Sequence, residues 1–587
     1  MSKARKKKPS RTTPQDAPSS GSPGSAAPAN PAPTRPALSR QRIRLFRVIA
    51  LALPFLLLGI VEAAFRLVPS LDGERDPYIN ISPVSVFSRT VTNGIEYYNI
   101  THSNILGGEE VHILVHKPAN TFRVFCLGSS ACAGWPHART ETWSAYLQQA
   151  LQTAYPGKNI EIINAAGHGF AAYRTRRVLD EAMELQPDLL FVWEGNNEFL
   201  EDRNYAPPAA GLVALACRLR TVQWLRTFFT PRTKMSGTEL KDLSKFFYTK
   251  AHAQALKLRA DPVQYSQVNA HFRDSFEEMV AQAQSHRVPL ILCTVPVNLR
   301  DWLPNVSTNR LTGAQFDQWQ KFYYAGRRGL LTSNLTAGIE AMHQAIALEP
   351  EYAESYFWLG RLLEAAGQKD AAWGAFSQAR DLDFNPFRAT SGFNDIIKSI
   401  AQANQNKGVY LLDLDHIFAN TTTNAAPGFD MFLDYVHPTK PANFVVARSA
   451  YQMILENGWL AGPPAVDHFT YHERAFGPHG EPFEDGMDPD EDVDMINVAL
   501  DSHQLQTALD ESANLMRLKL GRAPTGPDDP EFAQVPAEFA DRYRIVWHYL
   551  DVQRRTILNQ GITAQEQQDA ARQLDAFYDK EYPSGRL

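Results

Sequence analysis

The feature that most constrains the fold is a series of short apolar segments, each followed by turn residues and then by a helical pattern. Five of these segments are typical of buried strands: Phe122–Gly128, Ile160–Asn164, Asp188–Trp193, Pro289–Pro296 and Gly408–Leu414. The stretch from Glu141 to Ala154 is one of the amphipathic segments between them. Buried strands that alternate with helices predict an α/β fold with a parallel sheet and helices on both of its faces.

Polar residues and glycines stand just beyond these predicted strands. They are Gly128-Ser129-Ser130 after the first strand, Gly169 after the second, Gly195-Asn196-Asn197-Glu198 after the third, and Asp434-Tyr435-Val436-His437 near the end of the sheet. In open parallel sheets the reactive groups gather at the carboxyl ends of the strands. We therefore expect these four blocks to meet at one edge of the sheet.

The four blocks resemble those of the SGNH (GDSL-type) hydrolase family, and they occur in the family's order. The family's G-D-S block is similar to residues 128–130, its second-block glycine to Gly169, its G-x-N-D block to residues 195–198 and its D-x-x-H block to residues 434–437. The resemblance implies a flavodoxin-like core and a serine hydrolase. Two positions depart from the pattern, because Ser129 replaces the acid of G-D-S and Glu198 replaces the last Asp of G-x-N-D. Neither position is the nucleophile, base or oxyanion donor in the family, so the departures concern the subfamily rather than the activity.

The roles that the resemblance implies agree with the chemistry of the residues. Ser130 would be the nucleophile and His437 its base, since a hydroxyl becomes a good nucleophile when a group that titrates near neutral pH removes its proton. Asp434 would hold the other ring nitrogen of His437 and fix its tautomer. The oxyanion would be bound by the backbone N–H groups of Ser130 and Gly169 and by the side-chain amide of Asn197.

Each block alone also has a structural interpretation. A Gly-Ser-Ser sequence is common in turns, Gly169 fits a strand end, and Asn197 fits a helix N-cap. Four matches in order, each just after a predicted strand, favour the catalytic interpretation.

Three further polar residues lie near the predicted site. Arg300 and Arg388 are candidate substrate-binding residues, because membrane-linked, repeat-containing relatives of the family carry similar segments. A structural ion pair is the favoured alternative for each arginine. His168, beside Gly169, is interpreted as a loop residue rather than a second base.

Residues 304–386 interrupt the α/β pattern with a helical insertion that has a 34-residue period. Tyr356, Leu359, Gly360, Ala372, Phe376 and Ala379 in the second copy correspond to Phe322, Ala325, Gly326, Gly338, Met342 and Ala345 in the first. This spacing resembles two tetratricopeptide repeats, in which small residues let paired helices approach. We expect two copies to dock on the hydrolase body. A brace is the favoured role, and a groove for a protein partner is the alternative.

The N-terminal part of the chain is basic and then apolar. Residues 1–47 hold eleven Lys or Arg and one acid, which gives this segment a charge of +10 and leaves −16 on the rest of the chain. Its Pro-, Ala- and Ser-rich composition predicts a disordered tail. Residues 48–67, with an uncharged run from Val48 to Val61, predict a transmembrane signal-anchor helix about 30 Å long. A cleaved signal peptide is the alternative, which the lack of an A-x-A site disfavours.

The other segments complete the predicted organisation. Residues 68–120 form a linker and N-terminal extension, 121–303 and 387–457 are the two parts of the hydrolase domain, and 458–587 hold an acidic loop and a helical extension. The basic flank predicts a cytoplasmic N-terminus, with the catalytic domain on the periplasmic or extracellular face. A net-acidic body argues against nucleic acid as a partner. Four cysteines without a CxxC pair argue against a disulfide scaffold and a cysteine zinc site.

The sequence therefore predicts a membrane-anchored esterase that needs no metal or cofactor. Its substrate would be an ester-containing small molecule or an acylated carbohydrate. One alternative is an O-acyltransferase that acts on an envelope carbohydrate, because the same triad serves both reactions. A second is a non-catalytic scaffold that recruits a partner through the repeats, which the intact Ser, Asp, His and Asn set disfavours.

Overall fold

The computed structural model describes residues 40–67, 86–100, 111–200, 255–466, 504–520 and 537–581, with shorter stretches at 221, 469, 499–500, 522 and 524–534. The chain divides into two units, of which one comprises residues 1–71 with 219–221 and the other comprises the rest. Three predictions fall largely outside the described residues: the disordered tail up to residue 39, the linker from 68 to 85 and the acidic loop at 481–494.

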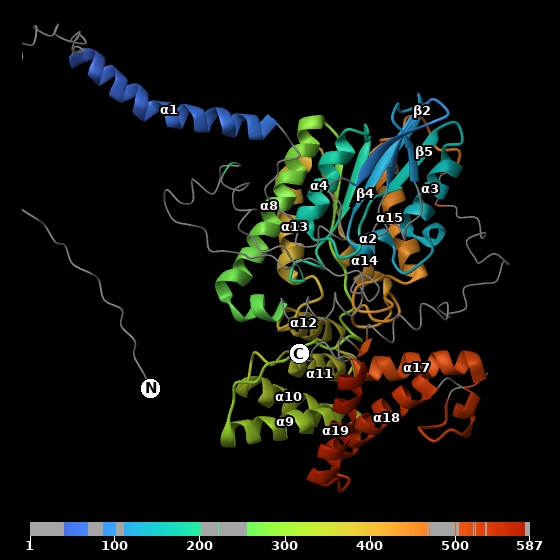
Figure 1. Ribbon diagram of the computed structural model, residues 1–587. Coiled ribbons are helices and arrows are strands. Elements are labelled where there is room, and N and C mark those ends of the chain that lie inside the picture. The colour runs from blue at the N-terminus through green and yellow to red at the C-terminus, as the bar shows by residue number, and fades with distance from the viewer. Residues whose placement is uncertain are drawn as a thin grey trace, which may run out of the picture. The chain divides into compact units, whose positions relative to one another are not determined.

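The second unit is built on a parallel sheet, which confirms the predicted α/β fold (Figure 1). The strands of this sheet in the described residues are β4 (Thr121–Gly128), β5 (Asn159–Asn164), β6 (Leu189–Trp193), β7 (Leu290–Cys293) and β8 (Val409–Leu412). Their order is β5-β4-β6-β7-β8, and each neighbouring pair is parallel. All residues of β6 and β7 are buried, because helices cover both faces of the sheet.

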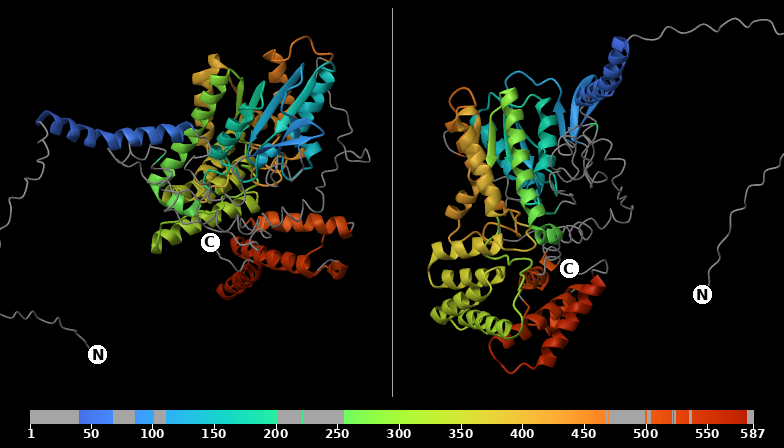
Figure 2. Two further views of the ribbon diagram at one scale, coloured as in Figure 1. Left: turned by 45° about the horizontal axis from the view of Figure 1, so that its top comes forward. Right: turned by 90° about the vertical axis from the view of Figure 1, so that its left-hand side faces the viewer.

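Helices cover the sheet in two layers (Figure 1, Figure 2). On one side α3 (Trp143–Ala154) packs against β5 and against α15 (Lys440–Glu456). On the other side α4 (Ala172–Met183), α8 (Pro262–His286) and α13 (Ser391–Asn404) form a second layer, in which α8 contacts both neighbours. Since every strand runs in the same direction, the loops that follow the strands lie at one edge of the sheet.

A small antiparallel sheet precedes the parallel one, within residues 68–120, which were expected to form a linker and N-terminal extension. It consists of β1 (Phe87–Thr92), β2 (Ile95–Ile100) and β3 (Val111–Leu114). Asn93 and Gly94, which join β1 to β2, both have positive φ angles, of 52° and 78°. An Asn-Gly pair between two short strands is the typical signal of a two-residue hairpin, so this element was detectable in the sequence.

The helix predicted at residues 48–67 is present as part of α1 (Arg40–Leu67). Among the residues that the structure describes, no helix is both long enough and apolar enough to cross a membrane. Membrane attachment through residues 48–67 stays a prediction.

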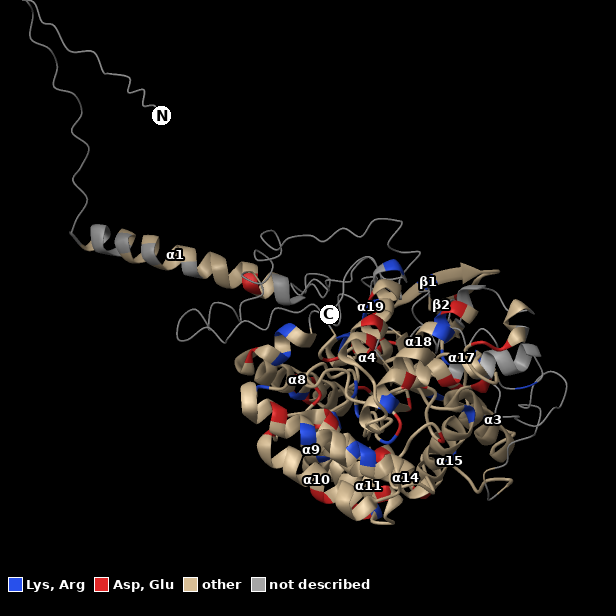
Figure 3. Cartoon of the chain, turned by 90° about the horizontal axis from the view of Figure 1, so that it is seen from below, with Lys and Arg blue, Asp and Glu red and all other residues tan. Residues whose placement is uncertain are grey.

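The insertion forms two helical hairpins. Helix α9 (Gly313–Leu331) packs on α10 (Leu335–Leu348), and α11 (Ala353–Ala365) packs on α12 (Lys369–Asp381). A Cβ atom on Gly329 would lie 2.4 Å from the Cα of Gly338, so these two helices approach closely because both positions are glycine. Seen from below, basic and acidic positions both occur along the ribbons of α9 and α11 (Figure 3). The tetratricopeptide assignment itself stays a prediction.

The described part of the C-terminal extension is helical. It contains α17 (Leu505–Leu520), α18 (Ala537–Ile557) and α19 (Ala564–Glu581), with a short 3-10 helix between α17 and α18. Helix α18 contacts α9, where the Arg328 side chain donates a hydrogen bond to the carbonyl of Ile557 at 2.7 Å. The extension therefore packs on the insertion.

Candidate active site

Three side chains from distant parts of the sequence form a hydrogen-bonded series beyond the end of β4. The Oγ atom of Ser130 lies 2.7 Å from Nε2 of His437, and Nδ1 of His437 lies 2.5 Å from Oδ2 of Asp434. Asp434 and His437 are buried, and Ser130 is half-buried. The structure thus brings together a hydroxyl, an imidazole and a carboxylate in the order that the sequence predicts.

The position of Ser130 is fixed by the sheet. Ser130 begins the short helix α2 (Ser130–Ala133), directly after β4. A Cβ atom on Gly128 would lie 1.9 Å from the carbonyl oxygen of Trp193, so only glycine lets β4 pass this close to the end of β6. The Asn164 side chain, at the end of β5, donates a hydrogen bond to the carbonyl of Cys132 at 3.0 Å and so holds α2.

Asp434 and His437 lie in the loop between α14 (Leu414–Thr421) and α15. The Oδ1 atom of Asp434 accepts the backbone N–H groups of Val436 and His437, both at 2.8 Å. The N–H of Leu433 donates to the carbonyl of His437 at 2.8 Å. One carboxylate oxygen of Asp434 therefore shapes the loop while the other holds the imidazole, which leaves Nε2 facing Ser130.

Two of the three predicted oxyanion donors, Gly169 and Asn197, lie on the loops after β5 and β6, and the third, the N–H of Ser130, follows β4. Gly169 has a φ angle of 69°, in the left-handed region that favours glycine. The buried amide of Asn197 donates to the carbonyl of Phe170, the next residue, at 2.8 Å. A primary amide has two N–H groups, so a second donor remains on the same nitrogen. The Glu198 carboxylate accepts the N–H of Ala172 at 2.8 Å, which ties the β6 loop to the start of α4.

Two further aromatic residues lie near the site. Trp135 was not singled out in the sequence, and His168 was expected to be a loop residue rather than a second base. The ring of Trp135 packs edge-on against His437, with centroids 4.5 Å apart. The ring of His168 also packs edge-on against Trp135, with centroids 6.3 Å apart. Burial, together with the charge of His437, lowers the pKa of His168 to about 4, so this imidazole is neutral at pH 7. Trp135 stands outside the four motif blocks, and no local pattern marks its contact with His437.

The two candidate substrate-binding arginines contact protein groups. Arg300 donates to Glu364 and to Asp301, both at 2.7 Å. Arg388 is buried and donates to the carbonyls of Asn298 and Trp302 at 2.7 and 2.8 Å. Contacts of this kind are expected of arginines that stabilise the fold, which was the alternative interpretation. A role in substrate binding stays a prediction.

Burial also changes the ionisation of Arg388 and its neighbour Asp383, which lies 3.7 Å away. Burial lowers the pKa of Arg388 to about 10, although the charge of Asp383 acts to raise it. It raises the pKa of Asp383 to about 6, although the charge of Arg388 opposes this change.

A comparison with known families adds to this geometry. The model of the GDSL-like lipase/acylhydrolase family matches residues 126–443, which is more than half of the chain. The chain belongs to the GDSL-like lipase/acylhydrolase family. It is therefore an ester-hydrolysing enzyme. A comparison with curated proteins finds no match.

The three cysteines that the structure describes in this acylhydrolase lack the properties of a nucleophile. Cys126, Cys132 and Cys293 are free and buried, and Cys217 lies outside the described residues. Burial raises the pKa of all three described thiols, which keeps them protonated and unreactive. Among the described residues, no group of three or more His, Cys, Asp or Glu side chains is arranged to hold a metal ion.

Proposed function

We propose that this acylhydrolase cleaves its ester through Ser130, with His437 as general base and Asp434 as the group that orients the imidazole. The observation that supports the proposal is the continuous series of short contacts, 2.7 Å from Ser130 to His437 and 2.5 Å from His437 to Asp434. Nε2 of His437 would take the proton of Ser130 as Oγ attacks the carbonyl carbon. The same nitrogen would then give that proton to the leaving alcohol.

The second half of the reaction would release the acyl group. A water molecule, deprotonated by His437, attacks the acyl-enzyme, and the proton returns to Oγ of Ser130 as the acid leaves. In both halves the tetrahedral oxyanion would be bound by the N–H groups of Ser130 and Gly169 and by the amide of Asn197. The contact between Asn197 and the loop after Gly169 supports this assignment. Loss of one such donor typically lowers kcat by about 10²–10³.

The test of this function is turnover of short p-nitrophenyl esters by the wild-type chain and by Ser130→Ala. We expect turnover in the wild type and its loss in the variant. A carbohydrate acceptor added to the same reaction, with mass spectrometry of the sugar, distinguishes hydrolysis from acyl transfer. Turnover that persists in Ser130→Ala would contradict the proposed nucleophile.

We also propose that the enzyme is attached to a membrane through residues 48–67, with its N-terminus cytoplasmic and its catalytic domain outside. The uncharged run from Val48 to Val61 and the basic residues before it support this location. The substrate would then be an ester at or beyond the outer surface of that membrane.

A further inference from the structure

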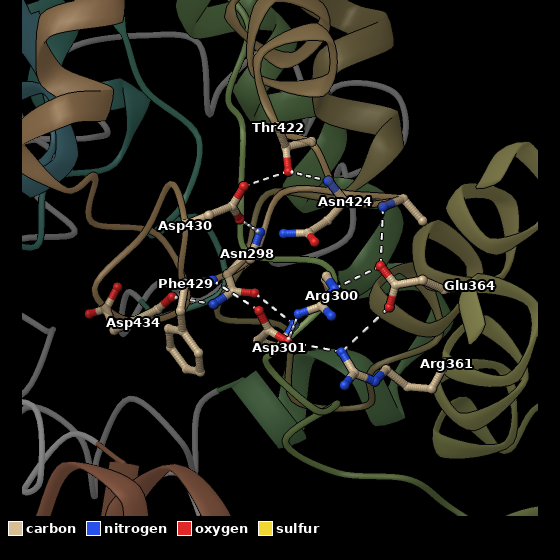
Figure 4. A network of polar contacts seen from close by, with 12 residues as sticks. Asn298, Arg300, Asp301, Arg361, Glu364, Thr422, Asn424, Phe429, Asp430 and Asp434 are labelled. Atoms are coloured by element: carbon tan, nitrogen blue, oxygen red, sulfur yellow. Dashed lines mark hydrogen bonds and ion pairs between the residues drawn. The ribbon is translucent and has the colours of Figure 1, made fainter. Parts of the chain in front are cut away.

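A network of four charged side chains joins the helical insertion to the loop after β7 (Figure 4). The insertion supplies Arg361 and Glu364, both from α11, and the loop supplies Arg300 and Asp301. Arg300 contacts Glu364 and Asp301 at 2.7 Å each, and Arg361 contacts Asp301 at 3.0 Å. The four side chains are between 15% and 29% exposed, so solvent screens their charges only in part.

The two carboxylates of this network also hold the backbone of the segment before Asp434. Glu364 accepts the N–H of Ala425 at 3.1 Å, and Asp301 accepts the N–H of Phe429 at 3.0 Å. A Cβ atom on Gly428 would lie 2.0 Å from Oδ2 of Asp301, so the backbone passes directly against this carboxylate. Glu364 of the insertion and Asp301 of the loop after β7 therefore hold the segment that leads to Asp434.

Asn298 extends the network to Asp434 itself. Its side chain is fully buried, and Oδ1 accepts the N–H of Asp301 at 2.9 Å. Its Nδ2 donates to the carbonyl of Asp434 at 2.9 Å, and its backbone N–H donates to the carbonyl of Tyr435 at 2.9 Å. Both ends of this amide are therefore used to join the charged network to the loop that carries the imidazole.

We propose that the helical insertion positions the catalytic loop, and that Glu364 and Asn298 are the positioning residues that hold this loop in register with Ser130. The effect on catalysis rests on the proposed function, in which Asp434 and His437 act on Ser130. A displacement of about 1 Å at reacting groups can lower a rate roughly 100-fold. Loss of the network therefore slows the chemical step without removing a contact to substrate.

The test uses the full chain with two conservative variants and a matched control. Glu364→Gln keeps the shape and one acceptor oxygen but removes the charge that pairs with Arg300. Asn298→Asp keeps the acceptor for Asp301 but removes the N–H that donates to Asp434. The control is Glu351→Gln, which removes an exposed ion pair between Arg310, before α9, and Glu351, between α10 and α11, in the same insertion.

Two measurements are made on each variant. In p-nitrophenyl ester hydrolysis, we expect kcat to fall roughly 10- to 100-fold in both test variants while KM changes less than about twofold. In hydrogen–deuterium exchange, we expect amides in 425–437 to exchange roughly tenfold faster, with the strands of the parallel sheet unchanged. The control should match the wild type in both measurements.

The two measurements separate this proposal from the proposed function. Unchanged exchange in 425–437 in both test variants would overturn the positioning role, and so would a raised KM with unchanged kcat. If the wild type lacks esterase activity but exchange rises in the variants as expected, the proposed function fails and the positioning role stands. Where Glu364→Gln does not fold, Arg361→Met removes the ion pairs of Arg361 with Asp301 and Glu364 and leaves the contact between Arg300 and Glu364, with the same expected results.

Discussion

At the scale of single residues, the site depends on the two oxygens of Asp434, which have different partners. Oδ1 caps the loop through two backbone N–H groups, and Oδ2 holds Nδ1 of His437. The first contact sets where the imidazole lies, and the second sets which nitrogen carries the proton. A substitution that keeps the shape but changes the charge therefore separates these two contributions.

Asp434→Asn provides that substitution. An amide at this position can still accept from the loop, but it does not stabilise a protonated His437, and it favours the wrong tautomer. We expect kcat for ester hydrolysis to fall by on the order of 10³–10⁴ with KM nearly unchanged. Steady-state kinetics at pH 7 measures this change, and a loss smaller than tenfold would show that Asp434 does not orient the base.

His168 gives a prediction about pH and stability. The folded pKa of His168 is about 4, below the ordinary value of 6.5, because burial and the charge of His437 disfavour its protonation. As the pH falls from 6.5 towards 4, the unfolded chain binds a proton at this residue that the folded chain does not bind. Its contribution to stability is therefore complete above pH 6.5 and is lost during acidification. We expect Tm to fall less between pH 7 and pH 5 in His168→Gln than in the wild type; an equal fall would contradict the shift.

At the scale of elements, the insertion depends on close contact between its helices. Gly329 of α9 faces Gly338 of α10, and Gly360 of α11 faces the ring of Phe376 on α12. Because the partner of Gly329 is backbone, an added methyl group cannot be accommodated by a side-chain rotation. The same insertion contains Gly374 in α12, which has no neighbour within 4 Å of an added Cβ.

Alanine substitutions of Gly329 and Gly374 form a matched pair. Gly329→Ala should destabilise the insertion by about 1–3 kcal/mol, because the helices must separate. Gly374→Ala should stabilise it by up to about 1 kcal/mol, since alanine is the better helix former at an exposed position. Thermal unfolding followed by circular dichroism compares them, and a Gly329→Ala chain that is as stable as Gly374→Ala would contradict the close packing.

The elements also show what the sequence could predict. The strands of the parallel sheet and the blocks after them could be predicted. A buried strand is a continuous apolar run, and each block is recognised from residues that are adjacent in the sequence. The hairpin at Asn93 and Gly94 could have been predicted from its turn residues, but its region was assigned only as a linker and N-terminal extension. The contacts of Trp135 and Asn298 with the catalytic loop could not be predicted, because they join segments that are far apart in the sequence.

At the scale of the whole molecule, the proposed membrane attachment predicts in which fraction of the cell the enzyme is found. We expect the full chain to sediment with membranes and to be released by detergent, and a chain that begins at residue 68 to stay in the soluble fraction. The physical reason is the apolar run from Val48 to Val61 after a basic flank. Fractionation with immunodetection measures both chains, and a soluble full chain would contradict the proposed attachment.

The central claim is that Ser130 is a nucleophile activated by His437. Reaction with a fluorophosphonate probe, followed by mass mapping of the labelled peptide, tests this claim most directly. We predict one labelled site at Ser130 in the wild type, at least about 100-fold slower labelling in His437→Gln, and none in Ser130→Ala. Labelling that persists in a folded Ser130→Ala chain, or a folded wild type that does not react, would contradict the account.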